Sequence, residues 1–176
     1  RVGSDDGLDG SEVVELALVD CAGAVLLDTL VRPSGPVPAE AAAIHGITDA
    51  MLAEAPTWSE VHDRFCDLVE GRQVVIYSRE FDTRVITQTA RRYGLPAPQG
   101  FDLALDGSAV HCAMQAYAEF RGEWSAEKGQ YRWQKLSAAA VQQGVTVTNA
   151  HRALGDCLMT LGVVRAIAST ENAQRV

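Results

Sequence analysis

The chain has 176 residues, of which 47% are hydrophobic, and a formal net charge of −8. This length and composition predict one domain, residues 1–176, with a substantial core. No run of about 18 apolar residues indicates a membrane span. The first residues lack a signal-peptide pattern, so we expect a soluble cytoplasmic protein.

The net charge excludes a protein that coats nucleic acid nonspecifically. It does not exclude a nucleic-acid enzyme, because a carboxylate cluster that recruits divalent cations is itself negative.

The cysteines argue against a zinc ribbon or a redox motif, since they are isolated from one another and make no CxxC pair. They are Cys21, Cys66, Cys112 and Cys157. We expect them to be buried, reduced thiols.

The first half of the chain begins with a predicted hairpin. Two apolar, β-branched runs, Glu12–Val19 and Ala24–Val31, are separated by a short turn sequence and are typical of antiparallel strands. Three prolines in Arg32–Pro38 predict a loop, because proline cannot donate to a ladder. A short helix is then expected at Ala39–Ala43.

A capping box and a buried strand follow. Thr57 and Glu60 have the spacing of that box and begin a predicted amphipathic helix that Gly71 ends. The run Gln73–Tyr77 is nearly all apolar, as expected for a strand buried on both faces. It leads directly into a helix predicted at Glu80–Tyr93.

The second half adds a predicted strand at Phe101–Leu105 and helices at His111–Phe120 and Trp133–Gln143. An apolar stripe over 154–164 predicts a long last helix that packs on the sheet. Its start lies at His151, which puts Asp156 in the second turn. Together the elements predict an α/β fold with a mixed sheet flanked by helices.

Asp82, His151 and Asp156 are the candidate site residues. Asp82 follows a buried strand, where α/β sheets usually place their sites, so it is well placed to hold a metal. The alternative is an aspartate favoured by the helix dipole alone. His151 and Asp156 are five positions apart and would diverge by about 140° on one helix. They can serve one site if His151 lies on the entering loop, and otherwise they are surface and cap residues.

Four segments, read together, resemble the DEDDh group of 3′-to-5′ exonucleases, the DnaQ-like proofreading superfamily with a ribonuclease H-like fold. They are EVVELALVD, LVRPSGPVPAEAAAIHGIT, VVIYSREFD and HRALGDC, in the family's order over nearly the whole chain. The resemblance implies removal of nucleotides from 3′ ends, with single-stranded DNA as the expected substrate. It also implies two Mg²⁺ or Mn²⁺ ions about 4 Å apart, held by four carboxylates.

The resemblance assigns roles to the three candidate residues. Asp82 and Asp156 match the metal ligands of the second and third motifs, and His151 matches the general base that removes a proton from the attacking water.

It also indicates four residues on the substrate side: Leu8, His45, Ser78 and Phe81. Ser78 stands where the second motif usually has asparagine, yet it keeps a hydrogen-bonding side chain. For His45 and Phe81, packing in the core is the alternative.

The first family motif, Asp-x-Glu-Thr-Thr-Gly-Leu, is not matched. Alignment puts Val2 at its aspartate and Ser4 at its glutamate, and neither binds metal as a carboxylate does. Three explanations stay open: the first central strand precedes Arg1 in the native chain, Asp5 or Asp6 supplies a substitute ligand, or the motif is lost. Loss of two of four carboxylates would remove several kcal/mol of metal stabilisation and several decades in rate.

A catalytically inactive domain that binds nucleic acid or a protein partner is therefore the alternative function. Three aromatic residues are interleaved with four basic ones, a composition that suits a single strand stacked on rings. They are Trp124, Tyr131 and Trp133, with Arg121, Lys128, Arg132 and Lys135. The competing interpretation is a solvated loop whose Trp133 anchors the next helix in the core.

Overall fold

The computed structural model describes residues 10–147 and 151–174. Within these ranges the strands form three two-stranded sheets. The antiparallel pairs are β1 (Glu15–Val19) with β2 (Val25–Leu30) and β5 (Trp124–Ser125) with β6 (Gln130–Tyr131); the parallel pair is β3 (Val74–Ile76) with β4 (Val110–Cys112). The fold is therefore the expected mixed α/β class, with its strands in separate ladders.

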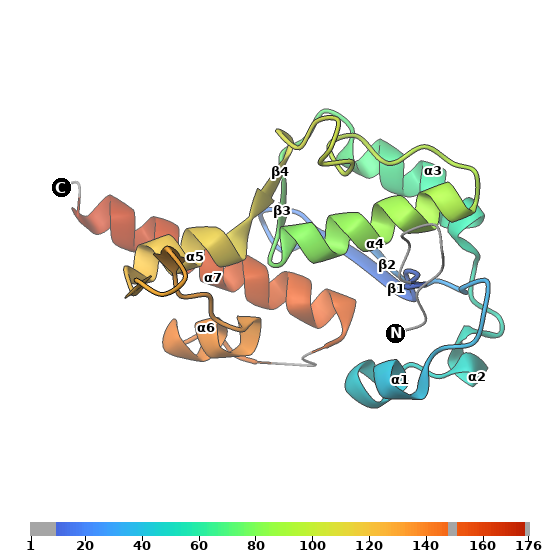
Figure 1. Ribbon diagram of the computed structural model, residues 1–176, viewed down its shortest axis with the longest axis horizontal. Coiled ribbons are helices and arrows are strands. Elements are labelled where there is room, and N and C mark those ends of the chain that lie inside the picture. The colour runs from blue at the N-terminus through green and yellow to red at the C-terminus, as the bar shows by residue number, and fades with distance from the viewer. Residues whose placement is uncertain (1–9, 148–150, 175–176) are drawn as a thin grey trace.

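Seven helices surround the strands in the described part of the chain (Figure 1). They are α1 (Ala39–His45), α2 (Asp49–Leu52), α3 (Trp58–Val69), α4 (Arg79–Arg92), α5 (Ala113–Arg121), α6 (Leu136–Gln142) and α7 (Ala153–Gln174). Helix α7 packs against β1, α5 and α6, whereas α4 packs against β3, β4 and α3. The starts of α4 and α7 are thereby positioned by strands that lie far apart in the sequence.

The predicted first hairpin is confirmed, and its turn shows why it forms. The Asp20 carboxylate accepts the N–H groups of Ala22 and Ala24 at 2.9 and 2.8 Å. Gly23 has a φ of 93°, which side chains of L-residues disfavour. Alternate residues of β1 then face opposite ways: Leu16 enters the core with α3 and α4, while Ala17 lies beside α7.

Helix α3 confirms the predicted capping box. The Glu60 carboxylate accepts the backbone N–H and the hydroxyl of Thr57, both at 2.7 Å. The buried face of α3 carries Trp58 and Phe65 into the main core. A second core lies between α5, α6 and α7 and includes Tyr117 and Met159.

Several predicted boundaries are wrong for identifiable reasons. The segment Phe101–Leu105 is a series of turns, in which the Leu105 N–H donates to the Asp102 carbonyl at 3.0 Å and Phe101 is buried edge-on against Phe65. Val75 is 48% exposed, so β3 is not buried on both faces as expected. The expected helix at 111–120 is preceded by β4, and α6 begins at Leu136 rather than Trp133.

The structure also differs from the expectations about cysteine burial and about a long apolar segment. All four cysteines are free, but none is fully buried as expected: Cys21 is exposed and the other three are partly buried. In the described residues, the stretch Ala153–Thr170 of α7 is long and apolar enough to cross a bilayer by length and composition alone. The helix packs against β1, α5 and α6.

Candidate active site

Asp82 lies in the first turn of α4, directly beyond the carboxyl end of β3. Its backbone N–H donates to the Ser78 carbonyl at 3.1 Å, which begins the helix. The side chain is half-buried, and burial together with the nearby charge of Asp156 raises the pKa of Asp82 to about 6. The carboxylate thus occupies a position where a second negative charge and poor hydration both disfavour its ionised form.

Asp156 lies in the first turn of α7, one turn earlier than the sequence predicted. Burial raises the pKa of Asp156, an effect that the His151 backbone N–H and side chain partly offset. That N–H donates to Asp156 Oδ1 at 3.2 Å. The structure therefore brings the starts of α4 and α7 together, with one half-buried carboxylate on each.

His151 precedes α7 on the entering loop, as the shared-site interpretation requires. Its side chain is exposed, and its φ of 69° is in the left-handed region. Outside glycine this conformation is uncommon and costs on the order of 1 kcal/mol. Such strain is found where function holds a residue in place, which supports the assignment of His151 to the site.

Glu15 holds the start of α7 and was missed by the sequence analysis. Its carboxylate receives two N–H groups of Arg152, at 2.7 Å from Nη2 and 3.0 Å from Nε. The same carboxylate accepts the Ala153 N–H at 2.8 Å, which satisfies a free donor at the helix start. An acidic residue within the apolar run EVVELALV was the available signal.

Cys157 lies near both carboxylates, and their negative charges affect the pKa of its thiol. Its thiol donates to the Ala17 carbonyl at 3.4 Å and so ties α7 to β1. Burial, followed by the charges of Asp156 and Asp82, raises the pKa of Cys157 to about 11. The thiol therefore stays protonated at neutral pH and serves packing rather than chemistry.

Of the four residues expected on the substrate side, Ser78 and Phe81 lie at the start of α4 and His45 lies at the end of α1. Phe81 is 54% exposed, with the Arg84 guanidinium 5.4 Å from its ring centroid, so it is not a core residue. His45 ends α1, where its Nδ1 accepts the Ile47 N–H at 3.0 Å. Ser78 is half-buried at the residue before α4. Their contact with substrate remains a prediction.

The expectations for the first motif fall on positions outside the described residues. They concern the substrate-side residue Leu8, the motif positions Val2 and Ser4, and the substitute ligands Asp5 and Asp6.

Asp82 and Asp156 form a donor pair that fits a divalent cation. Carboxylate oxygens are the ligands that Mg²⁺ and Mn²⁺ prefer, and a bound cation would stabilise both ionised forms. Within residues 10–147 and 151–174 there is no group of three or more side chains placed to hold a metal. The described donor set is therefore half of the four carboxylates that the resemblance implies.

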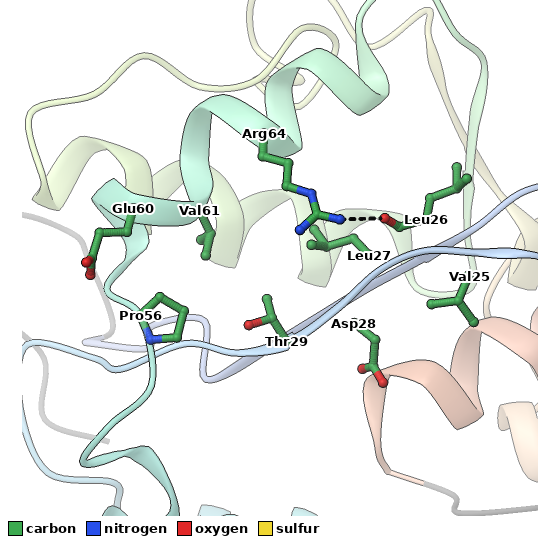
Figure 2. Close-up of a pocket in the computed structure, with 9 residues that line it drawn as sticks. All are labelled: Val25, Leu26, Leu27, Asp28, Thr29, Pro56, Glu60, Val61 and Arg64. Carbon is green, nitrogen blue, oxygen red and sulfur yellow. Dashed lines mark hydrogen bonds between the residues drawn. The ribbon is translucent and has the colours of Figure 1, made fainter.

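The hollow drawn in Figure 2 is separate from these carboxylates. It lies between β2 and α3, where Arg64 Nη2 donates to the Leu26 carbonyl at 3.2 Å. This hydrogen bond ties α3 to β2. Asp28 leaves β2 on the side away from α3 and points toward the start of α7 in Figure 2.

The chain belongs to the exonuclease family whose RNase_T model matches residues 4–164. It is a DnaQ-like member of the DEDDh group, with a ribonuclease H-like fold.

Among its relatives is the uncharacterized exonuclease CP81 of Escherichia phage 186, 50% identical over 91% of this chain and 81% of the relative. A DNA polymerase III subunit epsilon-like protein of Rhodobacter capsulatus is 34% identical over 86% of this chain but only 20% of the relative. Among solved structures, exonuclease X in complex with 5′ overhanging duplex DNA matches with a TM-score of 0.63 and 27% identity. That match covers 93% of this chain and 86% of the exonuclease X chain.

Proposed function

We propose that this protein is a cytoplasmic, metal-dependent exonuclease that removes nucleotides from the 3′ end of DNA, with single-stranded DNA as its preferred substrate. The observation that carries the proposal is the pairing of Asp82 and Asp156 at the starts of α4 and α7, each with a pKa raised by burial. Two carboxylates in this electrostatic state are suited to bind divalent cations. The exonuclease X structure contains DNA, which supports a nucleic-acid substrate here.

In this proposal each residue has a defined part. Asp82 and Asp156 would hold Mg²⁺ or Mn²⁺, which when bound would activate the attacking water and stabilise charge on the leaving oxygen. His151, exposed beside Asp156, accepts the proton that the water loses as it attacks phosphorus. The bond from phosphorus to the 3′ oxygen breaks, and that oxygen gains a proton as the shortened strand leaves.

The decisive experiment uses a single-stranded oligonucleotide labelled at its 5′ end and incubated with Mn²⁺. The wild type is expected to produce a ladder that shortens from the 3′ end, and a phosphorothioate linkage at that end should block it. Asp82→Asn and Asp156→Asn should yield no ladder. Asp63→Asn is the matched control, because its side chain is 95% exposed on α3. Equal degradation by wild type and Asp82→Asn would overturn the proposal.

A second candidate function is binding without cleavage. The observation that favours it is the lack of a third or fourth metal ligand within the described residues, together with Val2 and Ser4 at the first-motif positions. It predicts salt-dependent binding of the same oligonucleotide with no shortening in Mn²⁺. The 3′-end ladder described above would exclude it.

A further inference from the structure

The β5–β6 hairpin carries three large aromatic side chains into solvent. Trp124 is 57% exposed, Trp133 50% and Tyr131 37%. The competing expectation, that Trp133 anchors α6 in the core, is therefore wrong. Exposed clusters of this kind are unusual on a soluble domain and mark interaction surfaces.

The hairpin geometry puts these side chains on one side. Trp124 and Tyr131 are direct partners across the ladder, with ring centroids 5.2 Å apart at 83°. Ser125, the next residue of β5, is buried on the opposite face. The Arg132 N–H donates to the Glu123 carbonyl at 2.8 Å and extends the ladder. Trp133 follows Tyr131 by two residues, the spacing that returns a side chain to the same side of an extended chain.

The charge around these rings is positive, in contrast to the chain as a whole. Residues 121–135 contain four basic and two acidic side chains, whereas the net charge of the chain is −8. Arg121 is paired with Glu123. Lys128, Arg132 and Lys135 are exposed and make no ion pair with any residue that the structure describes. Three cations beside three rings complement a chain of phosphates and bases.

One hydrogen bond connects this hairpin to the carboxylate site. The Tyr77 hydroxyl donates to the Gln134 carbonyl at 2.9 Å, directly after Trp133 in the chain. Tyr77 itself follows β3 and precedes the start of α4, the helix that carries Asp82. The base of the hairpin is thus held at a fixed place relative to the site, alongside α5 and α6 in Figure 1.

We propose that the β5–β6 hairpin binds the body of a single-stranded nucleic acid, apart from the end that reaches Asp82 and Asp156. Bases stack on Trp124, Tyr131 and Trp133, and the basic side chains beside them contact the phosphates. This inference rests on the proposed function for the nature of the ligand. It adds a surface that would retain the strand between successive cleavages.

The test measures binding and hydrolysis separately. In EDTA, the anisotropy of a labelled 20-nucleotide single strand should report binding that Trp124→Ala with Trp133→Ala weakens by about tenfold or more, since stacking on one ring is worth roughly 1–3 kcal/mol per base. Phenylalanine at both positions should restore most of the affinity. Leu105→Ala, which removes an exposed apolar side chain elsewhere, is the control and should leave affinity unchanged.

Two further readouts identify the ligand contacts. Replacing Lys128, Arg132 and Lys135 by alanine should lower the slope of log affinity against log salt by about 2, at roughly 0.7 per phosphate contact. Hydrolysis of a p-nitrophenyl ester of thymidine monophosphate, which has no strand to stack, should be unchanged in the tryptophan variant.

The outcomes separate the two proposals. Cleavage of oligonucleotides with tryptophan-independent binding overturns the hairpin surface and leaves the nuclease intact. Tryptophan-dependent binding without any hydrolysis supports the surface and overturns the nuclease. Loss of self-association in the tryptophan variant, with no change in strand binding, would assign the hairpin to contacts between protein copies and overturn the inference.

Discussion

Glu15 and Arg152 join the first residue of β1 to the residue ahead of α7 through a two-pronged ion pair, at 2.7 and 3.0 Å. The Glu15 side chain is almost fully covered, whereas that of Arg152 remains partly exposed. Since Glu15 also accepts the Ala153 N–H, one carboxylate fixes both the approach to α7 and its first turn. Asp156 and His151 depend on this contact for their positions.

Glu15→Ala is expected to lower the free energy of unfolding by about 2 kcal/mol, because it leaves a charged donor and a helix N–H without their partner. Urea unfolding followed by circular dichroism measures the change. Glu123→Ala is the matched control: it also removes an Arg partner, but that pair is exposed on the hairpin and its loss should not be detectable. Equal effects of the two substitutions would contradict the role assigned to Glu15.

Asp82 should make stability fall with rising pH when no metal is bound. Its pKa is raised from 3.8 to about 6, so the folded chain binds this proton more tightly than the unfolded chain. The stabilisation is complete below pH 3.8 and is lost as pH rises through about 6. In EDTA at pH 8, Asp82→Asn should therefore be more stable than wild type by about 2 kcal/mol, after allowance for solvent screening of a half-buried group.

The control for this measurement is Asp106→Asn. Ser108 hydrogen bonds lower the pKa of Asp106, so that substitution should have the opposite sign at pH 8. A wild type that gains stability relative to Asp82→Asn between pH 5 and pH 8 would show that Asp82 is not held in an unfavourable ionised state.

Divalent cations should reverse this penalty. A cation that binds only the folded chain stabilises it by about 2.7 kcal/mol at a hundredfold excess over Kd, which for a domain of this size raises Tm by about 5–10 °C. We expect such a shift with Mn²⁺ at pH 8 for wild type and not for Asp82→Asn or Asp156→Asn. Differential scanning fluorimetry provides the measurement. A shift of equal size in all three proteins would place the cation elsewhere.

His151→Asn should lower hydrolysis at least about 100-fold without loss of stability, because asparagine tolerates positive φ and removes only the proton acceptor. Oligonucleotide binding in EDTA should not change, and added imidazole should restore part of the rate. His111→Asn, an exposed histidine on β4, is the control and should cleave at the wild-type rate. Cleavage by His151→Asn at that same rate would show that another group takes the proton.

The sequence correctly predicted those helix starts and turns that are stabilised by residues close to them in the chain. The Thr57 capping box and the Asp20 turn each satisfied their own backbone groups, and both are present in the structure. The long last helix is also present. The apolar stripe predicted over 154–164 is not its buried face, however, because Leu158 is 40% exposed while Met159 and Val163 are buried. The third motif also lay where the site needed it, with His151 on the loop and Asp156 in the helix.

What the sequence did not predict depends on partners far along the chain. Glu15 is 137 positions from Arg152, and an acidic residue in an apolar run is a signal for some buried contact but does not identify its partner. Phe101 was placed in a strand because its neighbours are apolar, yet contact with Phe65 buries it within a turn. The exposure of Trp133 was also undecided, since an aromatic residue ahead of a helix suits either a core anchor or a stacking surface.

The left-handed backbone at His151 makes this position a marker for hydrolytic activity across relatives. In this chain the histidine carries a conformational cost on the order of 1 kcal/mol, which glycine or asparagine would largely avoid. A lineage that kept nucleic-acid binding but no longer needed hydrolysis would gain stability by exchanging it. Relatives with glycine or asparagine at this position are therefore expected to be binding proteins, and those with histidine to have remained under selection for cleavage.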